Sequence, residues 1–176
     1  MEIRYINQSD DLLEISNIYE NSWKYAYKGI IPQDYLDSIP MGRWVSSIDK
    51  FRMNNLVVIE NGRIIGTARI SKSRWQQYSD YGEIISIYFL PAYMGKGYGQ
   101  HLLKKCIGEL SIRGYDKILL WVLEDNQRAR RFYEKNGFIL SDEEMISNIG
   151  GKALKEIMYI PQNWNVSQLM NIHDFL

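Results

Sequence analysis

The sequence predicts an α/β (α+β) domain with a mixed β-sheet of about seven strands flanked by helices, in which a central strand leads through a glycine-rich turn into a helix. Three observations predict this class. Ile84–Leu90 is an almost unbroken run of apolar, β-branched and aromatic residues, typical of a strand buried on both faces. Three glycines within 95–99 follow, and apolar residues then recur at helical spacing as far as Leu110. The dipeptide at 61–62, Asn-Gly, predicts an antiparallel hairpin between two apolar runs.

Composition limits the size and class of the protein. A chain of 176 residues suits one domain, which we expect over residues 1–160 with a tail over 161–176. Its 21 basic and 21 acidic side chains balance, which argues against nucleic acid or an anionic membrane as a partner. One cysteine and two distant histidines, His101 and His173, offer neither a disulfide nor metal-ligand spacing. Without a leader pattern or a long apolar run, a reduced, metal-free cytoplasmic protein is expected.

The first third of the chain is predicted to form one strand and three helices. Glu2–Ile6 alternates polar and apolar residues, as a strand with one wet face does. Ser9 and Asp10 can cap a helix over Leu12–Tyr25, where apolar residues recur every three or four positions. Pro32 starts a short helical piece, and Pro40–Met53 has a weaker helical pattern.

The rest of the chain alternates strands and helices. Leu56–Glu60 and Arg63–Ser71 are the arms of the predicted hairpin, and a doubly wound domain would have a crossover helix there instead. Arg74–Ser79 reads as a polar, aromatic loop. Ile118–Leu123 is a second apolar run after the helix, so strand, helix and strand predict a right-handed parallel crossover.

The last elements are a helix and a closing hairpin. Asp125 can cap the helix, and Gly137 stands where a C-terminal cap belongs. Phe138–Ile146 and Ala153–Ile160 are predicted to pair across Gly150-Gly151.

The glycine-rich turn is the chemical centre of the sequence. Glycines at a helix N-terminus let main-chain N–H groups close around an anion, and the helix dipole favours phosphate there. A P-loop is absent, and the glycine spacing departs from the dinucleotide pattern G-x-G-x-x-G. The acidic pair Glu124-Asp125 after the next strand keeps a dinucleotide-binding oxidoreductase as an alternative.

Two segments give a sharper interpretation. Ile87–Gly99 closely resembles the acetyl-CoA-binding motif [QR]-x-x-G-x-[GA] of the GNAT family of N-acetyltransferases. Asn126–Phe138 resembles the family's N-x-x-A-x-x-x-Y-x-x-x-G-F segment, in the right order and at the right distance. The resemblance covers roughly Glu2–Ile160. It departs at Met94, where the family usually has Gln or Arg, so the phosphate cradle is expected to rely on main-chain N–H groups and Lys96.

The resemblance implies an enzyme that transfers acetyl from acetyl-CoA, its co-substrate, to a primary amine by direct attack. Tyr133 would then protonate the departing thiolate, and Glu83, at the start of the central strand, would take the amine proton directly or through water. Some family members place this base where Trp121 stands here. The implied cofactor-binding residues are Ile87, Tyr88, Phe89, Gly95, Lys96, Gly97, Tyr98, Gly99, Gln100 and Asn126.

Plainer roles stay open for these side chains. Glu83 could be a solvated carboxylate at a strand end, Tyr133 a packed ring beside Phe132, and Asn126 a helix cap. A non-catalytic acetyl-CoA-binding module is a second alternative.

The acetyl acceptor is not readable from the sequence. A small-molecule amine and a protein amine both fit, and the chain could form a homodimer. Five aromatic residues of the helical region could each be core filler, or together could wall an acceptor pocket. They are Trp23, Tyr25, Tyr27, Tyr35 and Trp44.

Overall fold

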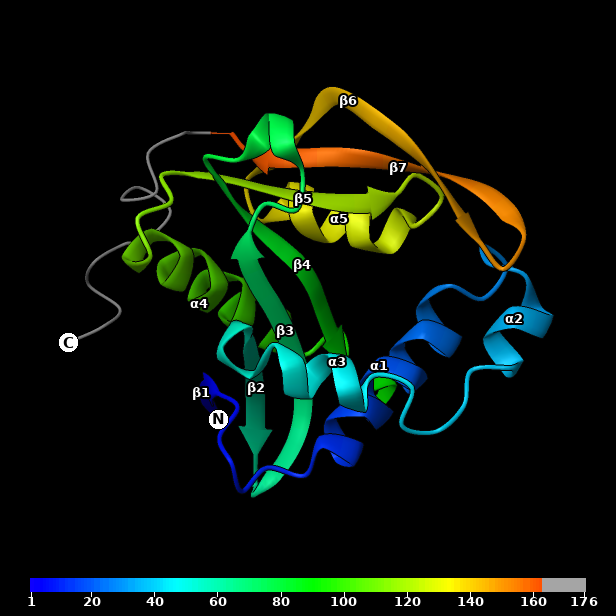
Figure 1. The fold of residues 1–176 in the computed structure, drawn as a ribbon, viewed down its shortest axis with the longest axis vertical. Helices are drawn as coiled ribbons and strands as arrows, with labels where there is room; N and C mark the ends of the chain where they lie inside the picture. The colour runs from blue at the N-terminus through cyan, green and yellow to red at the C-terminus, as the bar shows by residue number, and fades with distance from the viewer. Residues whose placement is uncertain (163–176) are drawn as a thin grey trace.

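The computed structural model describes residues 1–162, which form one seven-stranded sheet in the order β1-β2-β3-β4-β5-β7-β6 (Figure 1). The strands are β1 (Glu2–Tyr5), β2 (Asn55–Glu60), β3 (Arg63–Lys72), β4 (Tyr81–Phe89), β5 (Lys117–Leu123), β6 (Phe138–Ile149) and β7 (Lys152–Pro161). The α-helices are α1 (Leu12–Ala26), α2 (Gln33–Asp37), α3 (Val45–Lys50), α4 (Tyr98–Ile112) and α5 (Gln127–Lys135). Three 3-10 turns are η1 (Arg52–Asn54), η2 (Gln76–Tyr78) and η3 (Pro91–Tyr93).

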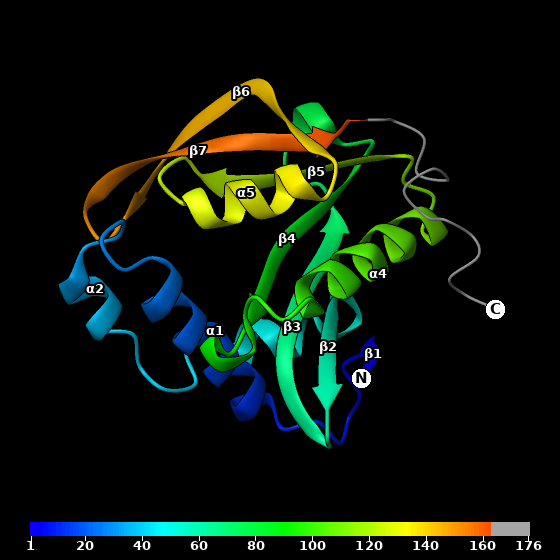
Figure 2. The ribbon, with the colours of Figure 1, turned by 180° about the vertical axis from the view of Figure 1, so that it is seen from behind.

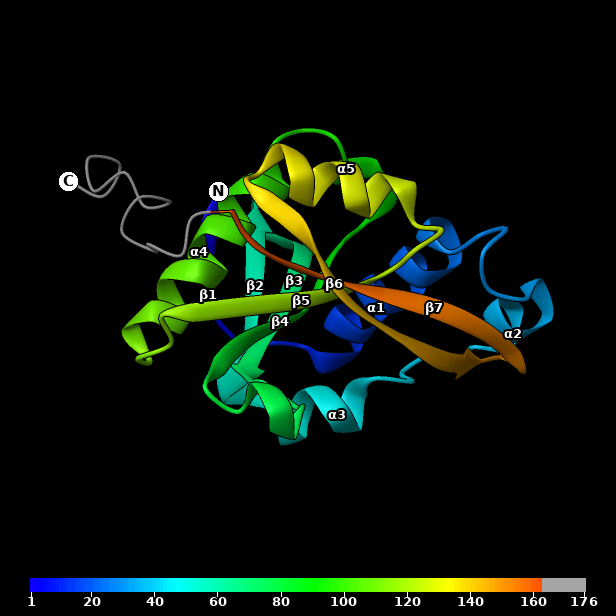
Figure 3. The ribbon, with the colours of Figure 1, turned by 90° about the horizontal axis from the view of Figure 1, so that it is seen from above.

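Helices cover both faces of the sheet, as the view from above shows (Figure 3). On one face, α4 and α5 pack on the sheet through a large apolar core that includes Leu102, Cys106 and Tyr133. On the other face, Ile15 and Ile18 of α1 pack with α3 against β2 and β3. The predicted mixed sheet between helical layers is therefore confirmed.

The sheet opens in its middle. β4 and β5 are parallel neighbours, but their register holds for only three pairs, from Tyr81↔Lys117 to Glu83↔Leu119. Beyond Glu83 the two strands diverge, and β5 continues as the partner of β7 (Figure 2). A bulge accompanies the divergence: Ile85 is an extra residue in β4, because Ile84 and Ser86 face consecutive residues of β3. A bulge bends its strand and increases the local twist.

The predicted strand pairing is confirmed in each of its three parts. β2 and β3 form the antiparallel hairpin, β4 and β5 are parallel, and β6 and β7 close the sheet as a hairpin. The expectation of a central strand buried on both faces is met at Ile84 and Phe89, but Ile85–Tyr88 are only partly buried, because β5 does not accompany this part of β4.

The third predicted helix is wrong in extent. Instead of Pro40–Met53, only Val45–Lys50 is α-helical, and η1 follows. The carboxylate of Glu20 accepts the Gly42 N–H at 2.7 Å. Gly42 is also left-handed, with φ +77°, and a helix cannot pass through that conformation.

Helix caps and strand ends also differ from the prediction in places. Asp11, not Asp10, caps α1, because Asp10 makes a two-pronged ion pair with Arg4 of β1. The predicted loop Arg74–Ser79 contains η2. Pro161, assigned to the tail, is the last residue of β7, and residues 163–176 of the predicted tail lie outside the described residues. The single domain over 1–160 stays a prediction.

A close approach of β3 to β4 gives the first testable prediction. Gly66 faces Phe89, and a Cβ at Gly66 would lie 2.3 Å from Cε1 of that ring. Since Phe89 is buried, the ring has little room to move, and Gly66→Ala should lower the free energy of unfolding by about 1–3 kcal/mol. Chemical denaturation should also show that adding Phe89→Leu recovers part of the loss. An unaffected Gly66→Ala variant would contradict the described packing.

Candidate active site

The open side of β4 is the first component of the site. Ile87, Tyr88 and Phe89 pair with β3 on one edge only, since β5 has left the other edge. In an antiparallel pair only alternate residues exchange N–H···O bonds with the partner. The remaining main-chain groups of β4 therefore point into the gap, where an extended ligand with amide groups could pair with them. Ser22 of α1 fixes the end of the strand by donating to the Phe89 carbonyl at 2.7 Å.

The glycine-rich turn lies at the end of this gap. Gly95 and Gly97 have φ of +77° and +91°, and Gly97 is the N-cap residue of α4. A Cβ at either glycine would meet no atom within 4 Å, so the space above the turn is open. Unpaired N–H groups at a helix start and the helix dipole suit a phosphate in that space. The turn thus has the geometry of the predicted anion cradle.

The other predicted cofactor-binding residues of the turn differ in how far they are buried and in what they contact. Gly99 lies within α4 without a positive φ, and its missing Cβ leaves room for Phe132 of α5, which would be 3.2 Å away. Its part in closing around a ligand is therefore indirect, through helix packing. Tyr98 points inward, stacking with Phe89 at a centroid distance of 6.4 Å. Lys96 and Gln100 are exposed, with the Lys96 ammonium 5.5 Å from a tyrosine ring in the same turn.

Asn126 is buried at the start of α5 and caps it. Its Oδ1 accepts the Ala129 N–H at 3.1 Å, and its own N–H donates to the Leu123 carbonyl at 2.8 Å. The predicted cap, Asp125, is wrong because this tight turn starts the helix one residue later. The cap uses only the amide oxygen, so the Asn126 side-chain NH₂ can still donate to a ligand. Capping and ligand contact are compatible.

Tyr133 is buried between α5 and the sheet. Its ring packs edge-on against Phe132 and Phe138, at centroid distances of 5.1 and 5.8 Å. Burial, and then the nearby Tyr88 and Cys106, raise the pKa of the Tyr133 phenol above its usual value. The phenol therefore keeps its proton at neutral and mildly alkaline pH. Tyr133 belongs to the core on the α4 and α5 face of the sheet, near enough to Tyr88 for the two phenols to influence each other.

Glu83 is the third residue of β4, and its side chain is buried. The expectation of a solvated carboxylate at the strand start is wrong, because β4 begins at Tyr81 and the β3–β4 connection covers the carboxylate. Arg74 of that connection holds both oxygens: its guanidinium approaches Oε1 to 2.6 Å, and its main-chain N–H donates to Oε2 at 2.9 Å. Sequence reasoning missed Arg74, because it lay in a segment read only as a loop.

The aromatic residues of the helical region divide into two groups. Trp23, Tyr27 and Trp44 form a wall with Tyr19 and Tyr88, and Trp23 Nε1 donates to the Tyr88 hydroxyl at 3.1 Å. Burial raises the pKa of Tyr27 to about 12, so its phenol is neutral in the wall. This wall stands on the α1 face of β4 and could border an acceptor.

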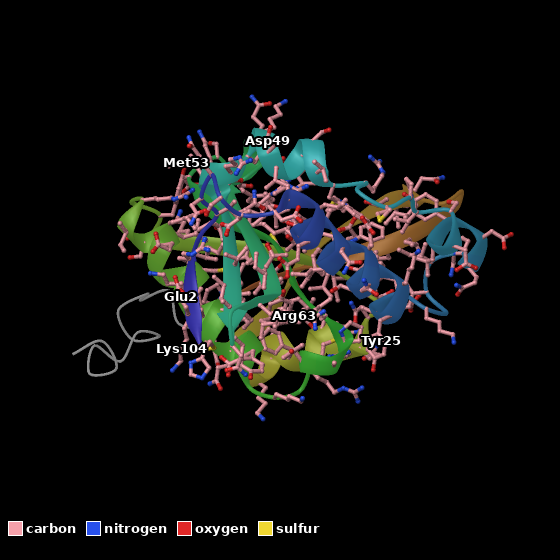
Figure 4. All side chains as sticks on the ribbon, turned by 90° about the horizontal axis from the view of Figure 1, so that it is seen from below. Glu2, Tyr25, Asp49, Met53, Arg63 and Lys104 are labelled. Carbon is pink, nitrogen blue, oxygen red and sulfur yellow. The ribbon has the colours of Figure 1, made fainter. Side chains whose placement is uncertain are left out.

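The remaining two aromatic residues lie elsewhere. Tyr25 is exposed at the end of α1, with the Arg128 guanidinium 5.4 Å from its ring (Figure 4). Tyr35 packs against Gly150 of the closing hairpin. An open cleft of about 390 Å³ separates the end of α1 from the start of α5. It is lined by Ala26, Lys28, Gly29, Ile30, Asp125, Asn126, Gln127 and Arg128.

Known proteins share this architecture. The acetyltransferase (GNAT) family model matches residues 13–138. The chain is 30% identical over 153 residues to the uncharacterised N-acetyltransferase YuaI of Bacillus subtilis, covering 84% of this chain and 86% of that protein. It is 26% identical over 153 residues to a spermidine N(1)-acetyltransferase of Thermoplasma acidophilum, covering 82% and 91%. The crystal structure of PaiA N-acetyltransferase from that organism, in complex with coenzyme A, superposes with a TM-score of 0.68 at 24% identity, covering 88% and 96%.

The split sheet and the glycine-rich helix start define an acetyltransferase fold. The chain belongs to the acetyltransferase (GNAT) family. This confirms the predicted N-acetyltransferase that uses acetyl-CoA, and it disfavours the dinucleotide oxidoreductase, whose sheet would be doubly wound and parallel. Within residues 1–162, no helix has the length and apolarity that crossing a bilayer requires.

The cradle can be tested with two glycines of equal backbone strain. Gly97→Val should abolish acetyl-CoA binding, because the side chain would fill the open space at the start of α4. Gly114→Val is the matched control, since Gly114 has φ +86°, also faces open space, and follows the far end of α4. Calorimetric titration should show lost binding for Gly97→Val alone, with similar melting temperatures for both variants. Equal acetyl-CoA affinity in the two would place the phosphates elsewhere.

Proposed function

We propose that the gap between β4 and β5 holds the acetyl-pantetheine arm of acetyl-CoA, and that a primary amine attacks the thioester from the α1 side. The observation that carries the proposal is the three-residue limit of the β4–β5 pairing, with the buried Tyr133 phenol beside the opened strands. The gap exposes main-chain donors and acceptors at one edge of β4, and the cradle of α4 lies beyond its end.

Each predicted cofactor-binding residue has a part in this arrangement. The main chain of Ile87, Tyr88 and Phe89 pairs with the pantetheine amides and polarises the acetyl carbonyl. The Asn126 NH₂ donates to the same arm. The pyrophosphate lies on the glycine-rich turn. The residues of the turn supply main-chain N–H groups, open space or positive charge, and they are Gly95, Lys96, Gly97, Tyr98, Gly99 and Gln100.

Two proton transfers complete the reaction. The amine nitrogen bonds to the thioester carbon, the C–S bond breaks, and the departing sulfur takes the phenolic proton of Tyr133. The amine proton passes to Glu83. Because a strand rises about 3.3 Å per residue, Glu83 lies roughly 13 Å along β4 from Ile87, so the amine either gives up its proton at Glu83 before it reaches the thioester or does so through bridging water.

The acceptor is a primary amine of a small molecule or of a protein. The relative of Thermoplasma acidophilum named as a spermidine N(1)-acetyltransferase supports a small polyamine, since the match spans most of both chains. The aromatic wall of Trp23, Tyr27 and Trp44 could border either kind of acceptor. The cytoplasmic location and the homodimer stay predictions.

A non-catalytic acetyl-CoA-binding module is the competing function. Such a module would bind acetyl-CoA in the same gap and on the same glycine-rich turn as the enzyme. It would differ from the enzyme only in not requiring the Tyr133 hydroxyl. A variant without that hydroxyl therefore separates the two.

Tyr133→Phe should keep the fold and acetyl-CoA affinity while lowering kcat by about a hundredfold or more, the usual effect of a positioned acid. Thiol release from acetyl-CoA would be followed with spermidine and with an unblocked peptide as acceptors. Because burial raises the Tyr133 pKa, the wild-type rate should not fall through loss of the phenolic proton below about pH 10.

Tyr115→Phe, which removes a hydroxyl from a partly buried tyrosine away from the gap, is the control and should retain wild-type turnover. Full turnover in Tyr133→Phe would end the general-acid assignment. Wild-type protein that binds acetyl-CoA but acetylates no amine would favour the binding module.

A further inference from the structure

The Arg74–Glu83 pair joins an exposed cation to a buried anion. The Glu83 side chain is 1% exposed, whereas that of Arg74 is 53% exposed. Arg74 Nη2 lies 2.6 Å from Oε1, and Nε lies 3.1 and 3.2 Å from the two oxygens. The main-chain N–H of Arg74 adds a fourth contact at 2.9 Å. The guanidinium thus stands between Glu83 and solvent.

This arrangement conflicts with a free base. A carboxylate whose two oxygens both accept hydrogen bonds from a guanidinium has little capacity left for the proton of an amine. Removing the cation alone would leave a buried, uncompensated charge, which is strongly unfavourable. A second cation must therefore take the place of Arg74 before Glu83 can act.

We propose that Arg74 guards Glu83, and that the positively charged ammonium of the acceptor displaces the guanidinium when it binds. The proposal rests on the function proposed above, in which Glu83 receives the amine proton. It adds a substrate requirement: the acceptor arrives as an ammonium ion, and neutral nucleophiles such as alcohols leave the guard in place.

The guanidinium is free to leave. Among residues 1–162, it hydrogen-bonds to no group other than Glu83. Arg74 follows the end of β3 and precedes η2, so its side chain can swing into water without disturbing the sheet. Because Arg74 is half exposed, water can hydrate the departing guanidinium, while the incoming ammonium restores the pairing of the buried Glu83 carboxylate. The main-chain N–H of Arg74 can stay on the carboxylate throughout.

The residue after Arg74 weakens the closed arrangement further. Trp75 packs on Trp121 of β5, with ring centroids 5.8 Å apart, and within residues 1–162 the indole N–H groups of both are buried without a hydrogen-bond partner. Buried donors left unpaired raise the free energy of the state that buries them. A shift of the Trp75 ring that leaves the Arg74 main chain in place would let these N–H groups reach water or a ligand oxygen, which lowers the cost of opening.

The test uses Arg74→Ala and guanidinium ion as a replaceable guard. Removing Arg74 should raise kcat/KM for the amine by about two- to fivefold, the scale of a partly exposed ion pair. Millimolar guanidinium chloride should then inhibit the variant in competition with the amine and leave the wild type unaffected. The acceptor would be whichever of spermidine and an unblocked peptide is turned over faster. Arg63→Ala removes an exposed arginine from the far end of β3 and should behave like the wild type (Figure 4).

Two other outcomes would contradict the proposal that Arg74 blocks Glu83. If guanidinium activates Arg74→Ala, the cation positions Glu83 for catalysis instead of blocking it. If neither the substitution nor guanidinium changes kcat/KM, Arg74 lies off the path of the acceptor. Glu83→Gln tests the underlying function separately: full turnover in that variant would remove Glu83 as the base, whatever guanidinium does to Arg74→Ala.

Discussion

The limit on β4–β5 pairing is the constraint on which the rest of the structure depends. Parallel neighbours normally continue side by side, but here β5 follows β7 after three pairs, and a bulge at Ile85 bends β4. The sheet is therefore two halves joined at Tyr81–Glu83. The divergence exposes one edge of β4 in the interior, and a buried polar edge requires partners. A ligand with amide groups is a physical solution, and acetyl-CoA is such a ligand.

The two halves also separate two chemical tasks. On the α4 and α5 side, the glycine turn leaves open space that receives the anionic end of the cofactor in the proposed function, and packing of Gly99 on Phe132 ties the two helices together. In the proposed function, the acceptor enters past the aromatic wall on the α1 side and the ion pair of Glu83 and Arg74. Tyr133 lies in the core on the α4 and α5 side, where Phe132 and Phe138 hold its ring.

Local patterns explain how much of this could be predicted from the sequence. The hairpin at Asn61-Gly62, the apolar run Ile84–Leu90 and the helical spacing after the glycines depend on neighbouring residues, and the structure has all three. The gap between β4 and β5 could not be predicted from local patterns, because an apolar strand has the same sequence pattern with or without a partner strand on its second edge. The family resemblance implied that Ile87, Tyr88 and Phe89 bind the cofactor, but the gap itself was not predicted.

Tertiary contacts account for the remaining differences. Asp10 forms an ion pair with Arg4, so Asp11 caps α1 instead. The Glu20 carboxylate accepts a hydrogen bond from the Gly42 N–H, within the segment where the third helix was expected. The partner of Glu83 lies nine residues earlier, and no periodicity marks Arg74 as such a partner. Contacts of this kind depend on how separate elements meet, which sequence patterns do not encode.

Hydrogen exchange along β4 tests the central claim most directly. Successive N–H groups of a strand point to opposite edges, so alternate amides of Ile85–Phe89 face the gap and lack a strand partner. Acetyl-CoA should slow exchange at those alternate amides and at the turn of Gly95–Gly99, and leave the amides of β2 unchanged. Protection confined to other segments, with 85–89 exchanging as in the free protein, would contradict the placement of the cofactor in the gap.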